Sequence, residues 1–548
     1  MKIKDILVAG SILVGVMSTT SCTQYLELTP TDKQSADTFF KTSTEAKQAL
    51  VGIYEKLRSD YNGYTNSVQF FDMAMGDDSY VGGDPSGTDM IEYQRIMRFS
   101  AQTNNYAAQV AWNKCYGGIQ RANTLLANYD NIDFTTAEED IKNNYKGEAL
   151  FLRAHFYFEL VRLFENIPMY TEPLIGEAWK ELEQSTPEAV YAQIAQDMND
   201  AVALMATEAP EGDEGRLTKY AAEAELAKVF LFYTGYYNKT TLPTTSGAEI
   251  TSDQVVTMLD DVINNSGASL VADYADLFNQ NGNYNTEAVF EIAFANTGSG
   301  DWGDWSYGNM FCQVNGPRGH NSDILVQGWG FNSPSRDLET SFEDGDARKA
   351  ATIVYAKDLI DAAGSTYQAN YNFTSMHGFK YTTHKWNQAD VNVELNWAQN
   401  FQYIRLADVL LMAAELTVDS NNSKASGYVN QVRNRAGLGS ISVVTLDNIK
   451  QERRVELAHE GHRYFDVLRW SNGNMANVSS EINVSNYTLT PPTETDASYI
   501  DDQGQNLTGD VGNASDFEIT FDESKKGFLP IPQSEIDLHP LLKQNAGY

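Results

Sequence analysis

The chain has 548 residues, a formal net charge of −35 and three cysteines. Apolar residues make up 42% of it, which is enough for a large core, so the composition excludes a wholly disordered protein. Asp and Glu number 74 against 39 Lys and Arg, and an acidic surface of this size repels phosphate backbones. We therefore expect no nucleic-acid partner.

The first 21 residues have the features of a lipoprotein signal peptide. Lys2 and Lys4 precede an apolar run at 6–17 that is too short to span a bilayer. Small residues then lead to Cys22, which stands where cleavage is expected. We predict that Cys22 becomes the lipidated first residue and anchors the protein to a membrane. An ordinary signal peptide with an incidental cysteine is the alternative.

After a polar tether at 22–43, the region 44–235 is dominated by helical patterns. Thr42 and Glu45 have the spacing of a capping box, and the segment 148–164 is apolar nearly all round, which is typical of a buried helix. Long helix pairs rich in Ala and aromatic residues favour tetratricopeptide-like hairpins, although the strict 34-residue signature is absent. Cys115 lies on a helical face and is expected to be packed; a disulfide with Cys312 is possible.

The chain changes character at 236–400, which is rich in Gly, Asn, Ser, Thr, Tyr and Trp. We expect long ordered loops there, with short strands such as 288–295. In the C-terminal region, 401–548, helical patterns return at 403–417, 427–435 and 446–469, before an irregular tail. The expected fold is mostly α: helical hairpins from both ends of the chain carry a loop-rich, minor-β region that binds a ligand.

Two motifs suggest chemistry that their surroundings do not support. Residues 298–303 match G-x-G-x-x-G, but no helix start follows to receive a pyrophosphate. The two histidines of His459-Glu460-Gly461-His462 are three residues apart, whereas zinc proteases place them four apart on one helical face. We interpret this stretch as an amphipathic helical segment whose paired charges fix helix packing.

No catalytic residues are predicted. The sequence contains neither a nucleophile elbow nor a phosphate loop. Neighbouring carboxylates do not indicate a catalytic pair, because such neighbours are frequent in a chain this acidic. The acidic stretches 77–89 and 342–346 could hold Ca²⁺, but neither has the order of an EF-hand loop. We expect no cofactor, with Ca²⁺ as the open alternative.

Aromatic residues on glycine-rich loops are the positive signal for binding. Trp302, Trp305, Tyr307 and Trp329 lie on such loops, and Tyr80 lies on another, close to Asp78. Such rings could be tucked under their loops, or they could form a platform for the apolar faces of sugar rings, with Asp and Asn nearby for hydroxyl groups. We predict glycan binding by Trp302, Trp305, Tyr307, Trp329, Tyr80 and Asp78.

Several segments match one family in order along the chain. They are CTQYLELTP at 22–30, EALFLRAHFYFELVRLFENIPM at 148–169, RLTKYAAEAELAKVFLF at 216–232, YIRLADVLLMAAEL at 403–416, NQVRNRAGL at 430–438, RRVELAHEGHRYFDVLRW at 453–470 and PIPQSEIDLHPLLKQNAGY at 530–548. With these segments the chain resembles the SusD/RagB-family nutrient-binding lipoproteins of the Bacteroidetes outer membrane. The region 236–400 matches least.

The resemblance implies tetratricopeptide-like helical hairpins, no catalysis, and a position on the cell surface at the outer membrane. It also implies a partner, a SusC-like TonB-dependent transporter, on which the protein acts as a lid that delivers glycan. A peptide-binding member of the same family and a glycoside hydrolase remain as alternatives. The family's ligand residues do not carry over by motif, so the predicted site residues depend on loop position and residue type.

Overall fold

The computed structural model describes residues 39–58, 68–84, 87–297, 307–360, 374, 376–388, 394–483 and 519–548. The predicted signal peptide, Cys22, most of the tether, Trp302 and Trp305 lie outside these ranges. No described helix combines the length and the apolar character needed to cross a membrane.

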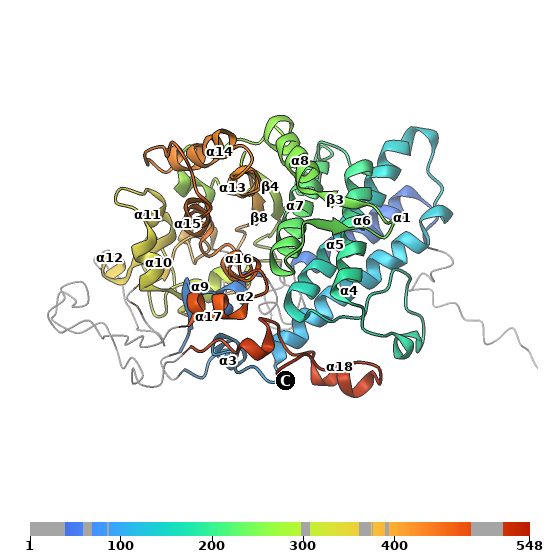
Figure 1. Cartoon of the computed structure of the whole chain (residues 1–548), viewed down its shortest axis with the longest axis horizontal. Coiled ribbons are helices and arrows are strands. Elements are labelled where there is room, and N and C mark those ends of the chain that lie inside the picture. The colour runs from blue at the N-terminus through green and yellow to red at the C-terminus, as the bar shows by residue number, and fades with distance from the viewer. Residues whose placement is uncertain are drawn as a thin grey trace, which may run out of the picture.

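A series of long helices forms the body of the molecule (Figure 1). Each packs on the next in the order α4, α5, α6, α7, α8, α13 and α14, while α1 lies against α4 and α5. This is the hairpin arrangement that the sequence predicts. The helices are α1 (Ser43–Arg58), α4 (Tyr106–Ala127), α5 (Glu139–Phe164), α6 (Pro187–Leu204), α7 (Lys219–Tyr236), α8 (Ser252–Asn265), α13 (Leu406–Thr417) and α14 (Asn422–Arg435).

Close packing in this series follows from the residues at its contacts. The side chains of α5 from Gly147 to Phe164 are buried all round, as its apolar sequence predicts. Gly118 of α4 faces this helix, and a Cβ atom there would lie 2.3 Å from the ring of Phe156. A glycine is therefore required where α4 and α5 approach most closely. The capping box at α1 is confirmed, because Glu45 accepts the Thr42 amide at 2.9 Å.

A loop-rich insertion separates α8 from α13. The chain enters this insertion along β4 (Ala288–Ile292) and comes back to the helices along β8 (Phe401–Arg405). These two strands pair antiparallel. Every sheet in the described residues has two strands. The remaining strands are β1 (Ser79–Gly82), which pairs with β5 (Phe331–Pro334), β2 (Thr241–Pro243), which pairs with β3 (Glu249–Thr251), and β6 (Ile353–Tyr355), which pairs with β7 (Met376–Gly378).

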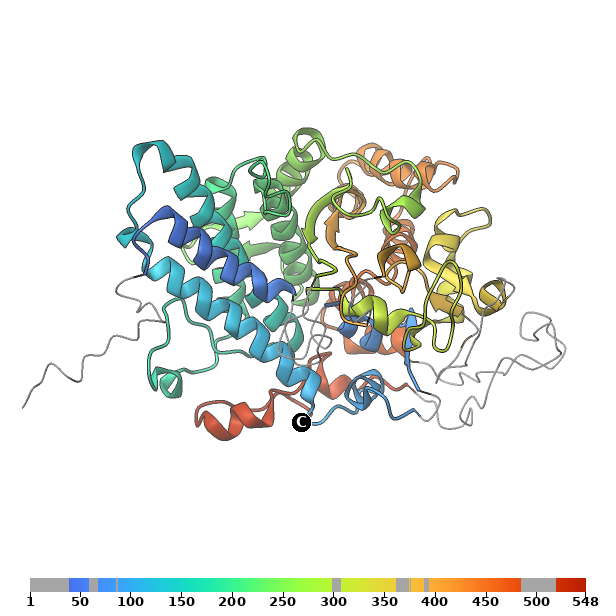
Figure 2. The same cartoon turned by 180° about the vertical axis from the view of Figure 1, so that it is seen from behind.

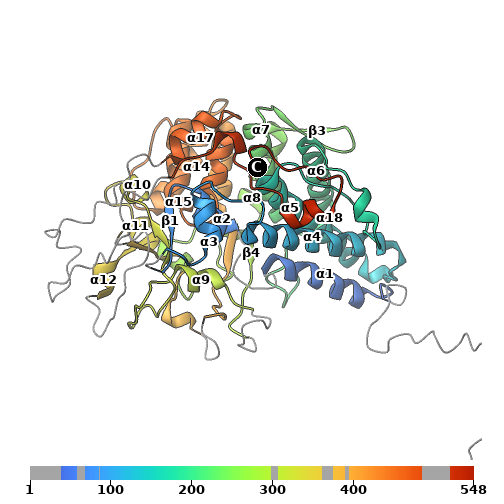
Figure 3. The same cartoon turned by 90° about the horizontal axis from the view of Figure 1, so that it is seen from below.

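Shorter helices complete the structure. In Figure 3, α1 and α9 lie on one side of the molecule, and α14 and α17 lie on the opposite side. Figure 2 shows the side of α1 and α9 from the front. The helices are α2 (Val68–Met75), α3 (Ile91–Met97), α9 (Met310–Asn315), α10 (Arg336–Ser341), α11 (Arg348–Thr352), α12 (Ala356–Ile360), α15 (Leu446–Leu457), α16 (Arg463–Trp470), α17 (Met475–Ile482) and α18 (Gln533–Leu538).

Three expectations need correction. The segment 446–469 is not one helix, because His459 and Gly461 have positive φ angles of 62° and 84° that end α15 before α16 begins. Residues 403–405 form part of β8, since they pair with β4. The region 236–400 contains the regular helix α8, whose start is fixed by a capping box at Thr251.

Both cysteines of the described chain are buried free thiols. Cys115 packs on the face of α4 as predicted, and the Cys115–Cys312 disulfide that the sequence left open does not form in this structure.

Candidate functional site

The predicted aromatic loop begins and ends at one point on the surface. The Ala295 amide donates to the Tyr307 carbonyl at 2.7 Å, which joins the two ends of the loop that carries Trp302 and Trp305. Tyr307 is 39% exposed, and the guanidinium of Arg58 lies over its ring, 4.4 Å from the centroid. The described residues that flank 298–306 thus lie next to the C-terminal end of α1, and Trp302 and Trp305 lie outside the described residues.

Trp329 lies on a second glycine-rich loop, where it is half-buried against the core. Its amide donates to the Gln313 carbonyl of α9 at 2.9 Å. The loop folds back because two glycines touch: a Cβ atom on Gly328 would lie 2.3 Å from the Cα of Gly316. Trp329 is therefore held on the scaffold, with only part of its surface open to solvent.

Tyr80 and Asp78 lie in the interior and not on an exposed loop. Tyr80 is in β1 and is 3% exposed, and Asp78 is 4% exposed. The Asp78 carboxylate accepts a hydrogen bond from Arg454 Nε at 2.7 Å. Burial raises the pKa of Asp78, although Arg454 opposes this. The prediction of a surface loop is wrong here, because pairing with β5 and with Arg454 draws the segment inward.

One exposed tryptophan was not predicted from the sequence. Trp386 is 39% exposed and follows His384, whose buried ring stacks on it at 5.6 Å between centroids. Burial lowers the pKa of His384 to about 4, so the imidazole beneath Trp386 is neutral at physiological pH. Trp397, eleven residues along, is fully buried and donates to Gln313 at 3.2 Å. Composition alone does not predict which of these two tryptophans is exposed to solvent.

The name aromatic surface is used here for three aromatic residues of the insertion that are at least partly exposed, Tyr307, Trp329 and Trp386. Its three members come from separate loops of the insertion between α8 and α13. Tyr307 and Trp386 are each 39% exposed, although Arg58 lies over the ring of Tyr307 and His384 stacks on the ring of Trp386. Such rings can stack on apolar faces of a ligand and exchange it rapidly.

The histidine motif is part of a buried ion network. Glu460 accepts from Lys380 Nζ at 2.7 Å and from Arg405 Nε at 2.8 Å. Glu456 contacts Arg348, Arg405 and Arg435. Burial by itself would raise the pKa of Glu456, but these three guanidinium groups lower it well below its usual value. The motif fixes packing, as the sequence analysis interpreted it, although it does so across a helix break.

The acidic stretches considered for Ca²⁺ also contact arginines. Asp77 accepts from Arg463 Nε at 2.6 Å, and Asp346 accepts from Arg348 Nε at 2.9 Å. Within the described ranges, no group of three or more His, Cys, Asp or Glu side chains is placed to hold a metal ion. These carboxylates serve as counterions inside the protein.

Two family models match separate parts of the chain. The model described as "SusD family" matches residues 286–548, and the model described as "Starch-binding associating with outer membrane" matches residues 24–231. SusD-like protein P25 of Formosa agariphila is 28% identical over 86% of this chain and 90% of its own length. A SusD-like protein of Bacteroides ovatus is 25% identical over 99% of this chain and 98% of its own length.

Solved structures agree with these matches. A "Laminarin binding SusD-like protein" is similar at a TM-score of 0.75 and 29% identity, over 93% of this chain and all of its own. Surface glycan-binding protein A from Bacteroides thetaiotaomicron is similar at a TM-score of 0.74 and 25% identity, over 93% of this chain and all of its own. The expected mostly α fold is confirmed, and this chain belongs to the SusD family.

Proposed function

We propose that the protein binds glycan at the cell surface and, acting as a lid, delivers it to a SusC-like TonB-dependent transporter without catalysis. The observation that carries the proposal is the full-length similarity to a laminarin-binding protein, at 29% identity. The aromatic surface supplies the chemistry, because sugar rings stack on exposed aromatic faces. Laminarin is therefore the first ligand to test.

Glycan would lie on Tyr307, Trp329 and Trp386, together with Trp302 and Trp305 of the adjoining loop. Each stacked ring contributes about 1 kcal/mol beyond burial. After the cost of association, a few rings give roughly micromolar to millimolar affinity. Binding of this strength is adequate for a protein that captures a ligand and then hands it on.

The proposed location is the outer membrane, with Cys22 as the lipid anchor. The match to a family model described as associating with the outer membrane supports this location. We expect Cys22→Ala to abolish lipid labelling and to move the protein from the membrane fraction to the soluble fraction. Unchanged membrane retention of this variant would contradict an anchor at Cys22.

Binding is tested by affinity electrophoresis in gels that contain laminarin. We expect retardation of the protein and no release of reducing ends from the polysaccharide. Product release by the purified protein would favour a glycoside hydrolase. Calorimetry with laminarin oligosaccharides and with peptides, side by side, separates a glycan binder from a peptide binder, and heat only with peptides would overturn the proposal.

A further inference from the structure

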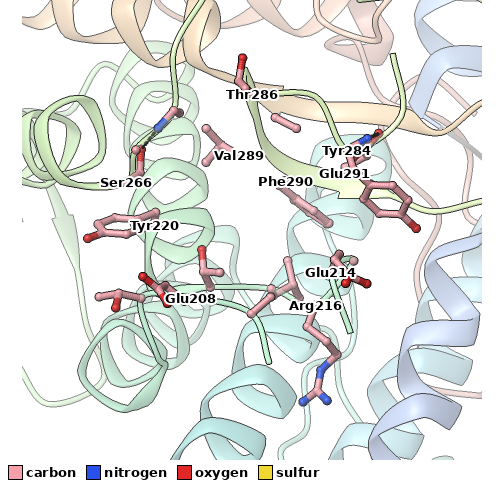
Figure 4. A pocket seen from close by; sticks show the side chains of 18 of the residues that line it. Glu208, Glu214, Arg216, Tyr220, Ser266, Tyr284, Thr286, Val289, Phe290 and Glu291 are labelled. Carbon is pink, nitrogen blue, oxygen red and sulfur yellow. Dashed lines mark hydrogen bonds between the residues drawn. The ribbon is translucent and has the colours of Figure 1, made fainter. Parts of the chain in front are cut away.

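A separate cleft of about 430 Å³ opens on the helical side of the insertion (Figure 4). It lies between the connection from α6 to α7, the end of α8 and the strand β4. This volume is in the range of small-molecule sites, about 300–1,000 Å³. None of the residues that form the aromatic surface lines it.

Carboxylates dominate the charge of the cleft. Glu208, Glu214 and Glu291 line it, and in the described part of the chain neither Glu208 nor Glu214 forms an ion pair. Arg216 contributes its stem, but its guanidinium points away from the cavity (Figure 4) and donates to Glu148 at 2.6 Å. The cleft therefore has an excess of negative charge within reach of a ligand.

Tyr284 forms one wall of the cleft in a fixed position. Tyr284 is 53% exposed, and its backbone has a φ of 54°, a conformation that is uncommon for a bulky residue. The Tyr284 amide donates to both carboxylate oxygens of Glu291, at 3.0 and 3.2 Å. Gly215 leaves the ring edge uncovered, since a Cβ atom there would touch Tyr284 Cε1 at 3.6 Å. The backbone of Tyr284 is thus held against the Glu291 carboxylate, and both residues line the cleft.

Glu291 has no cationic partner among the described residues. Burial raises its pKa to about 7, and the hydrogen bond from the Tyr284 amide offsets only part of that increase. A positive charge bound in the cleft would stabilise the ionised form of this carboxylate.

We propose that the cleft binds a protonated amino sugar. The ammonium group would lie between Glu214 and Glu291 against the face of Tyr284, where carboxylates and an aromatic ring both attract a cation. Asn285, Thr286 and Ser266 also line the cleft and offer hydrogen-bond partners for ring hydroxyl groups. This combination favours an amino sugar over a lysine side chain, whose stem is apolar. The inference concerns a site separate from the aromatic surface.

The test is calorimetry of the purified protein at pH 7, where about half of the Glu291 carboxyl groups are ionised before ligand binds, with glucosamine oligosaccharides and with their neutral N-acetylated counterparts. We expect saturable binding of the amino form and at least about tenfold weaker binding of the acetylated form, because charge-assisted contacts are lost. Glu214→Gln and Glu291→Gln should each weaken binding about tenfold, since each removes one such contact. Glu211→Gln, on the same connection but outside the cleft, is the matched control and should bind as the wild type does.

Equal binding of both sugar forms, unchanged binding in Glu214→Gln, or preference for lysine amide over glucosamine would each overturn the proposal. If Glu291→Gln does not fold, the exposed residue Glu214 still provides the test. Laminarin binding is measured in the same variants and should not change. Loss of glucosamine binding with laminarin binding intact therefore identifies the cleft, whereas a protein that binds glucosamine but never laminarin contradicts only the proposed function.

Discussion

The buried ion network and the aromatic surface use opposite kinds of side chain for opposite purposes. Around Glu456 and Glu460, guanidinium and carboxylate groups are sealed from water and contact one another. On the insertion between α8 and α13, Tyr307 and Trp386 are partly exposed to solvent. In this strongly acidic protein, charge fixes the scaffold, and the proposed function assigns the exposed aromatic rings to an uncharged ligand.

Removing the central cation of the network should have the largest effect. Arg405→Ala leaves Glu287, Glu456 and Glu460 buried without their shared guanidinium. We expect the free energy of unfolding to fall by about 3–5 kcal/mol, because breaking a buried pair leaves uncompensated charge. Urea denaturation measures this.

The matched control is Arg336→Ala, which removes an exposed partner of Glu339. We expect a change within about 0.5 kcal/mol, as for most surface ion pairs. If both substitutions lower the free energy of unfolding equally, the buried network does not stabilise the protein more than a surface ion pair does, and the account is wrong.

A second effect concerns pH. Burial raises the pKa of Asp72 to about 7, and the nearby carboxylates of Asp78, Asp466 and Asp77 add to this increase. A hydrogen bond from the Tyr464 amide acts in the opposite direction. The native state therefore keeps a proton that the unfolded chain loses near pH 4, and Asp72 lowers stability as pH rises from about 4 to 7.

Asp72→Asn should remove this loss while it keeps an acceptor for the Tyr464 amide. We expect the variant to be more stable than the wild type at pH 8, by on the order of a few kcal/mol, and the difference to vanish near pH 4. Urea denaturation at pH 4, 6 and 8 measures it, with Asp130→Asn as an exposed control. A difference that does not depend on pH would refute the assignment.

On the aromatic surface the expected effects are smaller and specific to binding. Tyr307→Ala and Trp386→Ala should each weaken laminarin binding about fivefold, since one stacked ring contributes about 1 kcal/mol. Melting temperatures should stay near that of the wild type because both rings are exposed. Tyr106→Ala, an exposed aromatic at the start of α4, serves as the control and should bind normally.

The smallest effect is expected from reductant. Cys115 and Cys312 are buried free thiols, so dithiothreitol should leave the melting temperature unchanged. A clear drop in melting temperature would show that a disulfide stabilises the protein.

Local sequence patterns predicted the parts of the fold that depend on local chemistry. The Thr42 capping box and the apolar run of α5 were enough to predict those helices. The break at His459 was not foreseen, because a positive φ at a residue other than glycine is uncommon and has no local sequence signature here. The strand at 403–405 was read as helix, since its pairing partner β4 lies more than 100 residues away.

The candidate site was predicted less well for a related reason. Exposure of an aromatic ring depends on contacts between distant loops, so Trp386 and Trp397 look alike in sequence and differ only in the fold. Tyr80 was expected on a loop because the pairing of β1 with β5 is long-range. Among the predicted aromatic residues that the structure describes, Tyr307 is exposed to solvent. Trp302 and Trp305 lie outside the described residues and remain predictions.

The most direct test is a crystal structure of the protein with a bound laminarin oligosaccharide. The proposed function predicts intact sugar stacked on the aromatic surface, with rings against Tyr307 or Trp386 and against the loop that bears Trp302 and Trp305. Cleaved sugar, or sugar bound away from these loops with all of these rings bare, would contradict it.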